Sequence, residues 1–276
     1  MRAAAALLGV LGVAAVGPAA WAAERPLRVA AATVCADQYV LALADRVQIA
    51  ALSPDAIDPT LSLMAEQAAG LPRLSPSAET YLDAGVDVLV TNAWSDHQTV
   101  AMVERFGVTV VRIPLVDSLD AVAEATTAVA RALGQADRGR VLVAGLRQRM
   151  EAVAAAPNGA GRMGLYLRPG GGTAAAGSFV DTIMSKAGLR NKATEQGLAG
   201  WASTDLERFI ADPPEVIVTS FFESPYPGSG RAFSSHPAFT RRAANLKRAD
   251  VPGAMWVCSG WMLAEAAAHL NAELAR

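Results

Sequence analysis

Residues 78–90, AETYLDAGVDVLV, and residues 206–220, LERFIADPPEVIVTS, have the same local pattern at two distant places in the chain. Each stretch begins with apolar residues at helical spacing, turns, and continues into a short run rich in Val and Ile. Each also has a glutamate in the expected first helical turn, Glu79 in one and Glu207 in the other. A helix, turn and strand cassette that occurs twice, more than a hundred residues apart, predicts two lobes built alike.

The sequence around both cassettes alternates between short apolar runs typical of strands and amphipathic runs typical of helices. We expect further strands at residues 27–32, 47–52, 108–113, 163–167 and 254–257, and further helices at 36–44, 61–69, 97–106, 179–187 and 261–274. Alternating helices and Val-rich strands are typical of α/β folds with mostly parallel sheets. The sequence therefore predicts an α/β protein.

Residues 118–156 differ from both flanks, because apolar residues recur there every three or four positions without strand-like runs. We interpret this segment as one long connecting helix, broken or kinked near Gly134. The expected organisation is a signal peptide at 1–22, an N-terminal α/β lobe at 23–117, the connecting helix at 118–156 and a C-terminal α/β lobe at 157–276. A helical connection predicts that the lobes close by only a small movement.

The first 22 residues resemble an export signal, with Arg2 before the apolar run 3–16 and an A-x-A pattern at 20–22. We expect cleavage near Ala22 and a periplasmic location. The alternative, a transmembrane anchor, needs about 20 apolar residues, and this run is shorter. A formal net charge of −2 gives no support to nucleic-acid binding.

The two cysteines of the chain, Cys35 and Cys258, are too few for a multi-cysteine zinc site or a disulfide scaffold. They are expected in the loops of the first and last strands, one in each lobe. They could pair across the lobes if their Cα atoms lie within about 7 Å. Two separate, mostly buried thiols are the expectation we favour.

Taken together, the export signal, the paired α/β lobes, the helical connection and the matched glutamates resemble the periplasmic substrate-binding proteins that serve ABC importers of cobalamin, ferric siderophores or haem. Besides the two cassettes, VCADQYVLALAD at 34–45 and SFVDTIMSKAGLRN at 178–191 resemble segments of that family. The resemblance implies a class III binding protein, two Rossmann-like lobes joined by a long helix, that is a monomer and not an enzyme. It also implies a metal chelate as ligand, no cofactor, and a permease dimer as partner onto which Glu79 and Glu207 dock. Capping of the two helices is the alternative role of these glutamates.

A ligand of such a protein is expected between the lobes, at the carboxyl ends of the strands. Broad aromatic faces suit a flat tetrapyrrole or a catecholate, and arginines suit anionic oxygens. Trp201 lies where the cobalamin-binding members have a cleft tryptophan. The glycine-rich segment 168–177 lacks the lysine of a phosphate-binding loop and is interpreted as backbone that approaches a bulky ligand. The candidate ligand-binding residues are Trp94, Tyr166, Arg168, Trp201, Phe222, Tyr226, Arg231 and Trp261.

Two other functions stay open at this point: an exported hydrolase, and a binding protein for an apolar ligand such as a lipid or sterol. No serine has the nucleophile context G-x-S-x-G, which counts against the hydrolase. The three histidines are not spaced as metal ligands, so we expect no bare-metal site. The segment CSGWMLAEAAAHL at 258–270 is shorter and less charged than the last loop of cobalamin-binding members.

Overall fold

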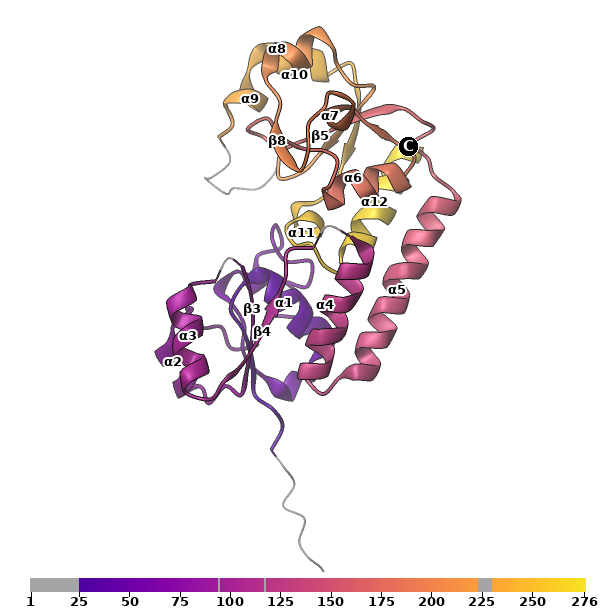
Figure 1. The fold of residues 1–276 in the computed structure, drawn as a ribbon. Coiled ribbons are helices and arrows are strands. Elements are labelled where there is room, and N and C mark those ends of the chain that lie inside the picture. The colour runs from indigo at the N-terminus through magenta and orange to yellow at the C-terminus, as the bar shows by residue number, and fades with distance from the viewer. Residues whose placement is uncertain (1–24, 94, 117, 223–229) are drawn as a thin grey trace, which may run out of the picture.

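The computed structural model describes residues 25–276 except 94, 117 and 223–229, and it contains two α/β lobes beside a pair of long helices (Figure 1). The predicted fold class, two α/β lobes joined by a helical connection, is confirmed. The expected signal peptide at 1–22 and the candidate residues Trp94 and Tyr226 lie outside the described residues.

The first lobe contains a four-stranded parallel sheet in the order β2-β1-β3-β4. Its strands are short and apolar because both faces of the sheet are covered. Helices α1 and α4 pack on one face, and α2 and α3 on the other. The elements are β1 Val29–Ala31, α1 Val34–Leu43, η1 Arg46–Gln48, β2 Ile49–Ala51, η2 Pro54–Ile57, α2 Ala78–Asp83, β3 Val88–Asn92, α3 His97–Arg105 and β4 Thr109–Ile113.

The helix expected at 61–69 is wrong, because residues 59–70 form consecutive turns. Two side chains draw the backbone away from helical geometry. Gln38 donates a hydrogen bond to the buried hydroxyl of Ser62 at 3.0 Å. Arg46 donates to the carbonyl oxygens of Gln67 and Ala69 at 3.1 and 2.7 Å. The segment is thereby fixed to the first lobe, and its backbone hydrogen bonds are those of turns, with isolated i to i−4 bonds such as that from the amide of Ala68 to the carbonyl of Met64.

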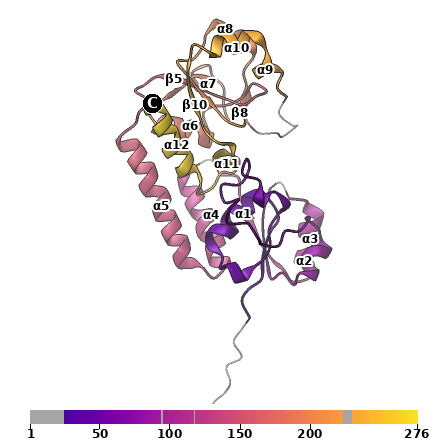
Figure 2. The same cartoon turned by 180° about the vertical axis from the view of Figure 1, so that it is seen from behind.

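The connection between the lobes is a helical hairpin of α4 Leu119–Ala132 and α5 Ala136–Ala155 (Figures 1 and 2). The helical connection is thus broken near Gly134, as one of the two alternatives had it, but its two parts fold back on each other and do not form one long helix. Gly134 adopts φ +71°, a left-handed conformation that ends α4 and reverses the chain. The 20 residues of α5 span about 30 Å. Its C-terminal half reaches the second lobe, where Leu146, Met150 and Val153 enter the core.

The second lobe repeats the arrangement with a parallel sheet in the order β10-β9-β5-β7 and adds an antiparallel pair, β6-β8. Both cassettes are confirmed as a helix followed by a strand, α2 with β3 in the first lobe and α8 with β9 in the second. The elements of this lobe are β5 Met163–Leu167, β6 Gly172–Ala174, α6 Phe179–Lys186, β7 Arg190–Asn191, α7 Lys192–Glu195, β8 Trp201–Ser203, α8 Leu206–Ala211, β9 Val216–Thr219, α9 Ala232–Ser235, α10 Pro237–Ala243, β10 Lys247–Asp250, α11 Gly253–Trp256 and α12 Leu263–Ala275.

The strand expected at 254–257 is wrong, since these residues fall in and directly after the short helix α11. The last strand is β10, whose sequence KRAD has no apolar run. Three of its four residues are not buried, because β10 lies at the edge of the sheet and only Ala249 faces the core. An edge strand of this kind is not detectable from hydrophobic pattern.

The chain between α11 and α12 returns to the first lobe. Trp261 packs against the core of the first lobe, and its indole nitrogen donates to the carbonyl oxygen of Gln38 at 3.2 Å. The helix that follows, α12, packs against α5 and against the core of the second lobe (Figure 2). The lobes are thus held by α5 and by this C-terminal segment.

Candidate functional site

A cavity of about 770 Å³ lies between the two lobes. The first lobe lines it with α1, with Asp55 of η2 and the nearby Leu61, and with the carboxyl ends of β3 and β4. The second lobe lines it with the loop after β5, the start of α6, β8, and the loops that follow β9 and α11. Most of these segments follow the carboxyl ends of parallel strands, where open α/β sheets bind ligands. The cavity therefore lies where the sequence predicts the site.

Aromatic rings form the wall of the cavity in the second lobe. Trp201 is 51% exposed, although it is a large apolar residue. Its ring centroid lies 5.4 Å from that of Phe179 and 6.3 Å from that of Tyr166, both in edge-to-face contact. Trp256 lies behind Phe179, with ring centroids 6.3 Å apart. This wall offers a broad apolar face to a ligand.

The side chain of Arg168 lies between two of the aromatic rings at the cavity. Its guanidinium carbon is 4.7 Å from the ring centroid of Trp201 and 4.9 Å from that of Phe221. Its Nε donates a hydrogen bond to the hydroxyl of Tyr166 at 3.1 Å. Burial raises the pKa of the Tyr166 phenol, and the charge of Arg168 opposes this rise. The phenol therefore stays neutral and supports the arginine.

The glycine-rich segment after Arg168 forms a tight turn against the protein, and not a surface that approaches the ligand. The amide of Arg168 donates to the carbonyl of Gly172 at 2.8 Å. Gly171 adopts φ +84°, and a Cβ there would lie 2.9 Å from the ring of Phe233 and 3.0 Å from the carbonyl oxygen of Thr204. Packing within the lobe therefore requires a glycine at position 171, directly before β6.

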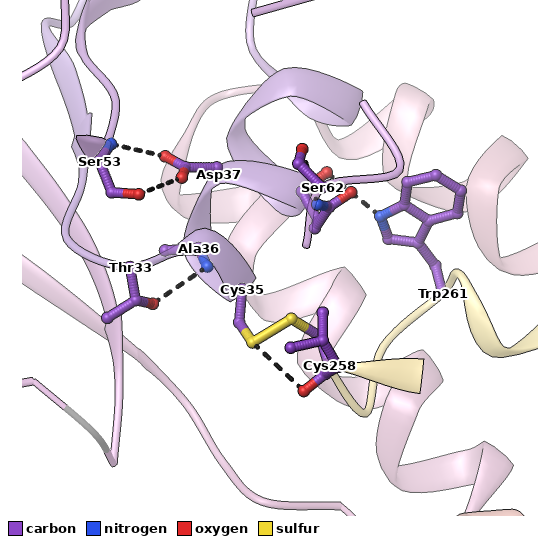
Figure 3. Close-up of a disulfide and its surroundings, with 10 residues drawn as sticks. Thr33, Cys35, Ala36, Asp37, Ser53, Ser62, Cys258 and Trp261 are labelled. Atoms are coloured by element: carbon purple, nitrogen blue, oxygen red, sulfur yellow. Dashed lines mark hydrogen bonds between the residues drawn. A yellow bond between two sulfur atoms is a disulfide. The ribbon is translucent and has the colours of Figure 1, made fainter. Parts of the chain in front are cut away.

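A disulfide between Cys35 and Cys258 forms part of the cavity lining between the lobes (Figure 3). The two Cα atoms are 5.4 Å apart, well inside the range for a disulfide. The favoured expectation of two separate thiols was therefore wrong. Cys35 lies in the first turn of α1, which Thr33 caps, and Cys258 follows α11. The two lobes are covalently connected at their cleft.

The structure brings together three of the candidate ligand-binding residues, Tyr166, Arg168 and Trp201. Arg168 and Trp201 line the cavity, whereas Tyr166 is fully buried behind them. Phe222 instead stacks on Phe239 with centroids 6.4 Å apart and lines a different cavity.

Two further candidates lie apart from the described lining of the cavity. Trp261 lies at the lobe junction, as described above. Arg231 is exposed and donates to the carbonyl of Phe222 at 2.9 Å. Sequence reasoning missed the lining residues Phe179, Phe221 and Trp256. Trp256 was missed because residues 254–257 were assigned to a strand. Phe179 and Phe221 could have been found as apolar residues beside the expected cleft loops.

Glu79 and Glu207 occupy matching places on the two lobes. Both are exposed in the first turn of a short helix, α2 or α8. The caps of these helices are made by other residues, Ser77 with the amide of Thr80 and Asp205 with the amide of Arg208. Neither glutamate forms a hydrogen bond or ion pair with another described residue.

Two kinds of feature are absent from the described part of the chain. It contains no group of three His, Cys, Asp or Glu side chains able to hold a metal ion. Within the same residues, none of the helices has the length and apolar character needed to cross a bilayer.

Solved structures with this fold include three periplasmic binding proteins. A heme binding protein from Pseudomonas aeruginosa is 22% identical, with 90% of this chain and 92% of that chain covered and a TM-score of 0.69. The heme binding protein HutB of Vibrio cholerae is 16% identical, with 89% and 98% covered and a TM-score of 0.73. The vitamin B12 binding protein BtuF of Vibrio cholerae is 16% identical, with 91% and 97% covered and a TM-score of 0.64. At these identities the likeness is one of fold.

None of the curated proteins matches the chain. The family model described as "Periplasmic binding protein" matches residues 48–244, which include both cassettes, the helical hairpin and most of the cleft. This protein therefore belongs to the periplasmic binding protein family.

Proposed function

We propose that this protein is the non-catalytic substrate-binding component of an ABC importer, and that it captures a metal chelate in the cleft and delivers it to the permease. The observation that carries the proposal is the aromatic wall with its arginine, which lines a cavity of about 770 Å³ between two lobes. A haem, a corrinoid or a ferric siderophore has a broad face for the rings and polar groups for the arginine. The names of two structural neighbours include haem and vitamin B12, which are two of these three ligand classes.

The proposal is tested by titrating purified protein with haem, cyanocobalamin and ferric siderophores while tryptophan fluorescence is followed. A bound chelate should quench Trp201, which is half exposed at the cavity. Trp201→Phe should bind the same chelate with a smaller quenching amplitude, and the remainder should come largely from Trp256, which also lines the cavity. Trp261→Phe, at the buried lobe junction, serves as the matched control and should keep the full amplitude. If no chelate binds but a sterol or fatty acid does, the protein is an apolar-ligand carrier; ester hydrolysis would indicate the hydrolase.

Delivery is proposed to use Glu79 and Glu207 as docking residues for arginines on the two permease subunits. An exposed carboxylate on each lobe, without a partner in the described chain, is suited to a charge-assisted contact that fixes orientation. The double variant Glu79→Ala, Glu207→Ala should lose uptake of the chelate by cells and keep its affinity in solution. A control with the same loss of charge, Glu66→Ala with Glu151→Ala, should leave both unchanged. A fall in affinity of the first variant would contradict the docking role.

We also propose that the protein reaches the periplasm through removal of residues 1–22. The basis is the sequence pattern of Arg2, the apolar run and the A-x-A site. The expected result is a mature protein in the periplasmic fraction whose N-terminal sequence begins near Ala23. Retention of residues 1–22 in a membrane fraction would indicate an uncleaved anchor.

A further inference from the structure

We propose that Phe221 is a positioning residue that holds Arg168 in the cleft, and that Arg168 held in this way selects ligands that present an anionic oxygen group. This inference rests on the proposed function, since it concerns the same cavity. It adds a residue that the sequence did not identify and the charge class of the ligand.

Arg168 is surrounded by two aromatic rings and one neutral hydroxyl group. The guanidinium has an aromatic ring on either side, Trp201 at 4.7 Å and Phe221 at 4.9 Å, and one neutral hydrogen-bond partner, the Tyr166 hydroxyl. No carboxylate of the described chain lies within ion-pair distance of it. A half-buried cation between rings is poorly hydrated and gains strongly from an anion. Its remaining N–H groups are able to bind a carboxylate or catecholate oxygen.

The backbone conformation of Phe221 and the space beside Gly253 fix the position of its ring. Phe221 adopts φ +64°, a left-handed conformation that is uncommon for a bulky side chain and is kept only where the surroundings enforce it. The ring lies against Gly253, where a Cβ would come within 2.6 Å of two ring carbons. The same Cβ would lie 3.2 Å from the carbonyl oxygen of Thr60 in the first lobe. Gly253 therefore provides the space that this ring position requires.

The ring of Phe221 also lines both the cleft that contains Arg168 and a neighbouring cavity that contains other acids. A second cavity, of about 450 Å³, adjoins the cleft, and Phe221 is the described residue that lines both. Asp250 and Glu273 line the second cavity, where they pair with Arg248 and Arg276. Without the ring, the guanidinium would keep only its contacts with Trp201 and the Tyr166 hydroxyl, and the carboxylates of the second cavity would compete for it.

The test compares chelates of similar shape and different charge: haem with its dimethyl ester, and an anionic ferric tris-catecholate with a neutral ferric tris-hydroxamate. The protein should bind the anionic member of at least one pair about ten-fold to a hundred-fold more tightly, the range expected for a charged hydrogen bond. Arg168→Met and Phe221→Leu should both lose this preference. Phe221→Tyr, which keeps the ring, should retain it, and so should Phe106→Leu, which removes an exposed ring far from the cavity.

Gly253→Ala provides a second variant for the case in which Phe221→Leu does not fold, because it displaces the ring without altering Phe221. Its preference for the anionic chelate should fall as well, with a circular dichroism spectrum like that of the unmodified protein. Equal binding of both members of each pair by the unmodified protein, or an unchanged preference in folded Phe221→Leu or Gly253→Ala, would overturn the inference and leave the proposed function standing. Failure to bind any of the four chelates, and cyanocobalamin as well, would contradict the proposed function.

Discussion

Asp37 is a fully buried carboxylate whose hydrogen-bond donors are the amide and hydroxyl of Ser53, at 2.9 and 2.5 Å. No cation of the described chain pairs with it, so burial dominates and raises its pKa to about 7 (Figure 3). The hydrogen bonds from Ser53 oppose this rise, and the charge of Asp55 adds to it. The first turn of α1 therefore contains a group that titrates near neutral pH.

This pKa predicts that the protein loses stability as the pH rises from about 4 to about 7. In this window the unfolded chain releases the Asp37 proton while the folded protein keeps it, so the free energy of unfolding falls with pH. Values of 3.8 and about 7 correspond to at most about 4 kcal/mol. Asp37→Asn should remove this part of the slope, as seen in melting temperatures at pH 5 and pH 8. Asp83→Asn, an exposed control, should keep it; the same slope in Asp37→Asn would contradict the assignment.

At the scale of elements, the packing of α4 against α5 depends on one of two glycines in α5. A Cβ at Gly139 would lie 2.4 Å from the Cβ of Ala130 in α4, whereas at Gly145 the nearest atom is the end of the Arg149 side chain at 3.5 Å. Both glycines have ordinary helical backbone. The first is required by the hairpin, and the second only weakens its helix.

Replacing Gly139 and Gly145 by alanine should therefore change the stability of the protein in opposite directions. Gly139→Ala forces the helices apart and should destabilise the protein by about 1–3 kcal/mol, even after the gain in helix propensity. Gly145→Ala should stabilise it by up to about 1 kcal/mol, because alanine is the better helix former and has room. Urea unfolding of both variants measures the difference. Equal shifts of the two midpoints in the same direction would show that α4 and α5 are not closely packed at Gly139.

At the scale of the whole molecule, the disulfide closes a loop that contains most of the chain, since Cys35 and Cys258 are 223 positions apart in sequence. It acts beside the α4–α5 hairpin and the hydrogen bond from Trp261 to Gln38. The lobes thus have a covalent connection at the cleft in addition to the helical one behind it. We expect a preformed cleft that closes by a small movement.

Loss of the disulfide should lower stability by about 5 kcal/mol in the chain-entropy account, because the unfolded chain regains the freedom of a long loop. Cys35→Ser with Cys258→Ser should show this loss in denaturant unfolding, and its midpoint should not respond to reductant. The midpoint of the unmodified protein should fall to the same value on reduction. The radius of gyration, measured by X-ray scattering with and without a bound chelate, should change more for the double variant. Identical midpoints in oxidised and reduced protein would contradict a stabilising disulfide.

The sequence by itself determined the α/β class, the duplicated cassettes and most of the helices and strands, because hydrophobic period and turn residues act locally. It also identified two residues that line the cleft. Arg168 directly follows β5, and Trp201 is the first residue of β8. Local pattern failed where distant groups decide the conformation. The side chains of Gln38 and Arg46 hold residues 59–70 in turns, and the edge strand β10 has no apolar face to detect.

Only the tertiary structure decided the pairing of Cys35 with Cys258, the reversal of the chain at Gly134 and the role of Phe221. Each depends on which atoms meet across long separations in the chain. The thiols are brought within bonding distance by the docking of the two lobes, and the ring of Phe221 is placed by the space at Gly253. Such contacts follow from the packing of whole lobes, which no local pattern of residues contains.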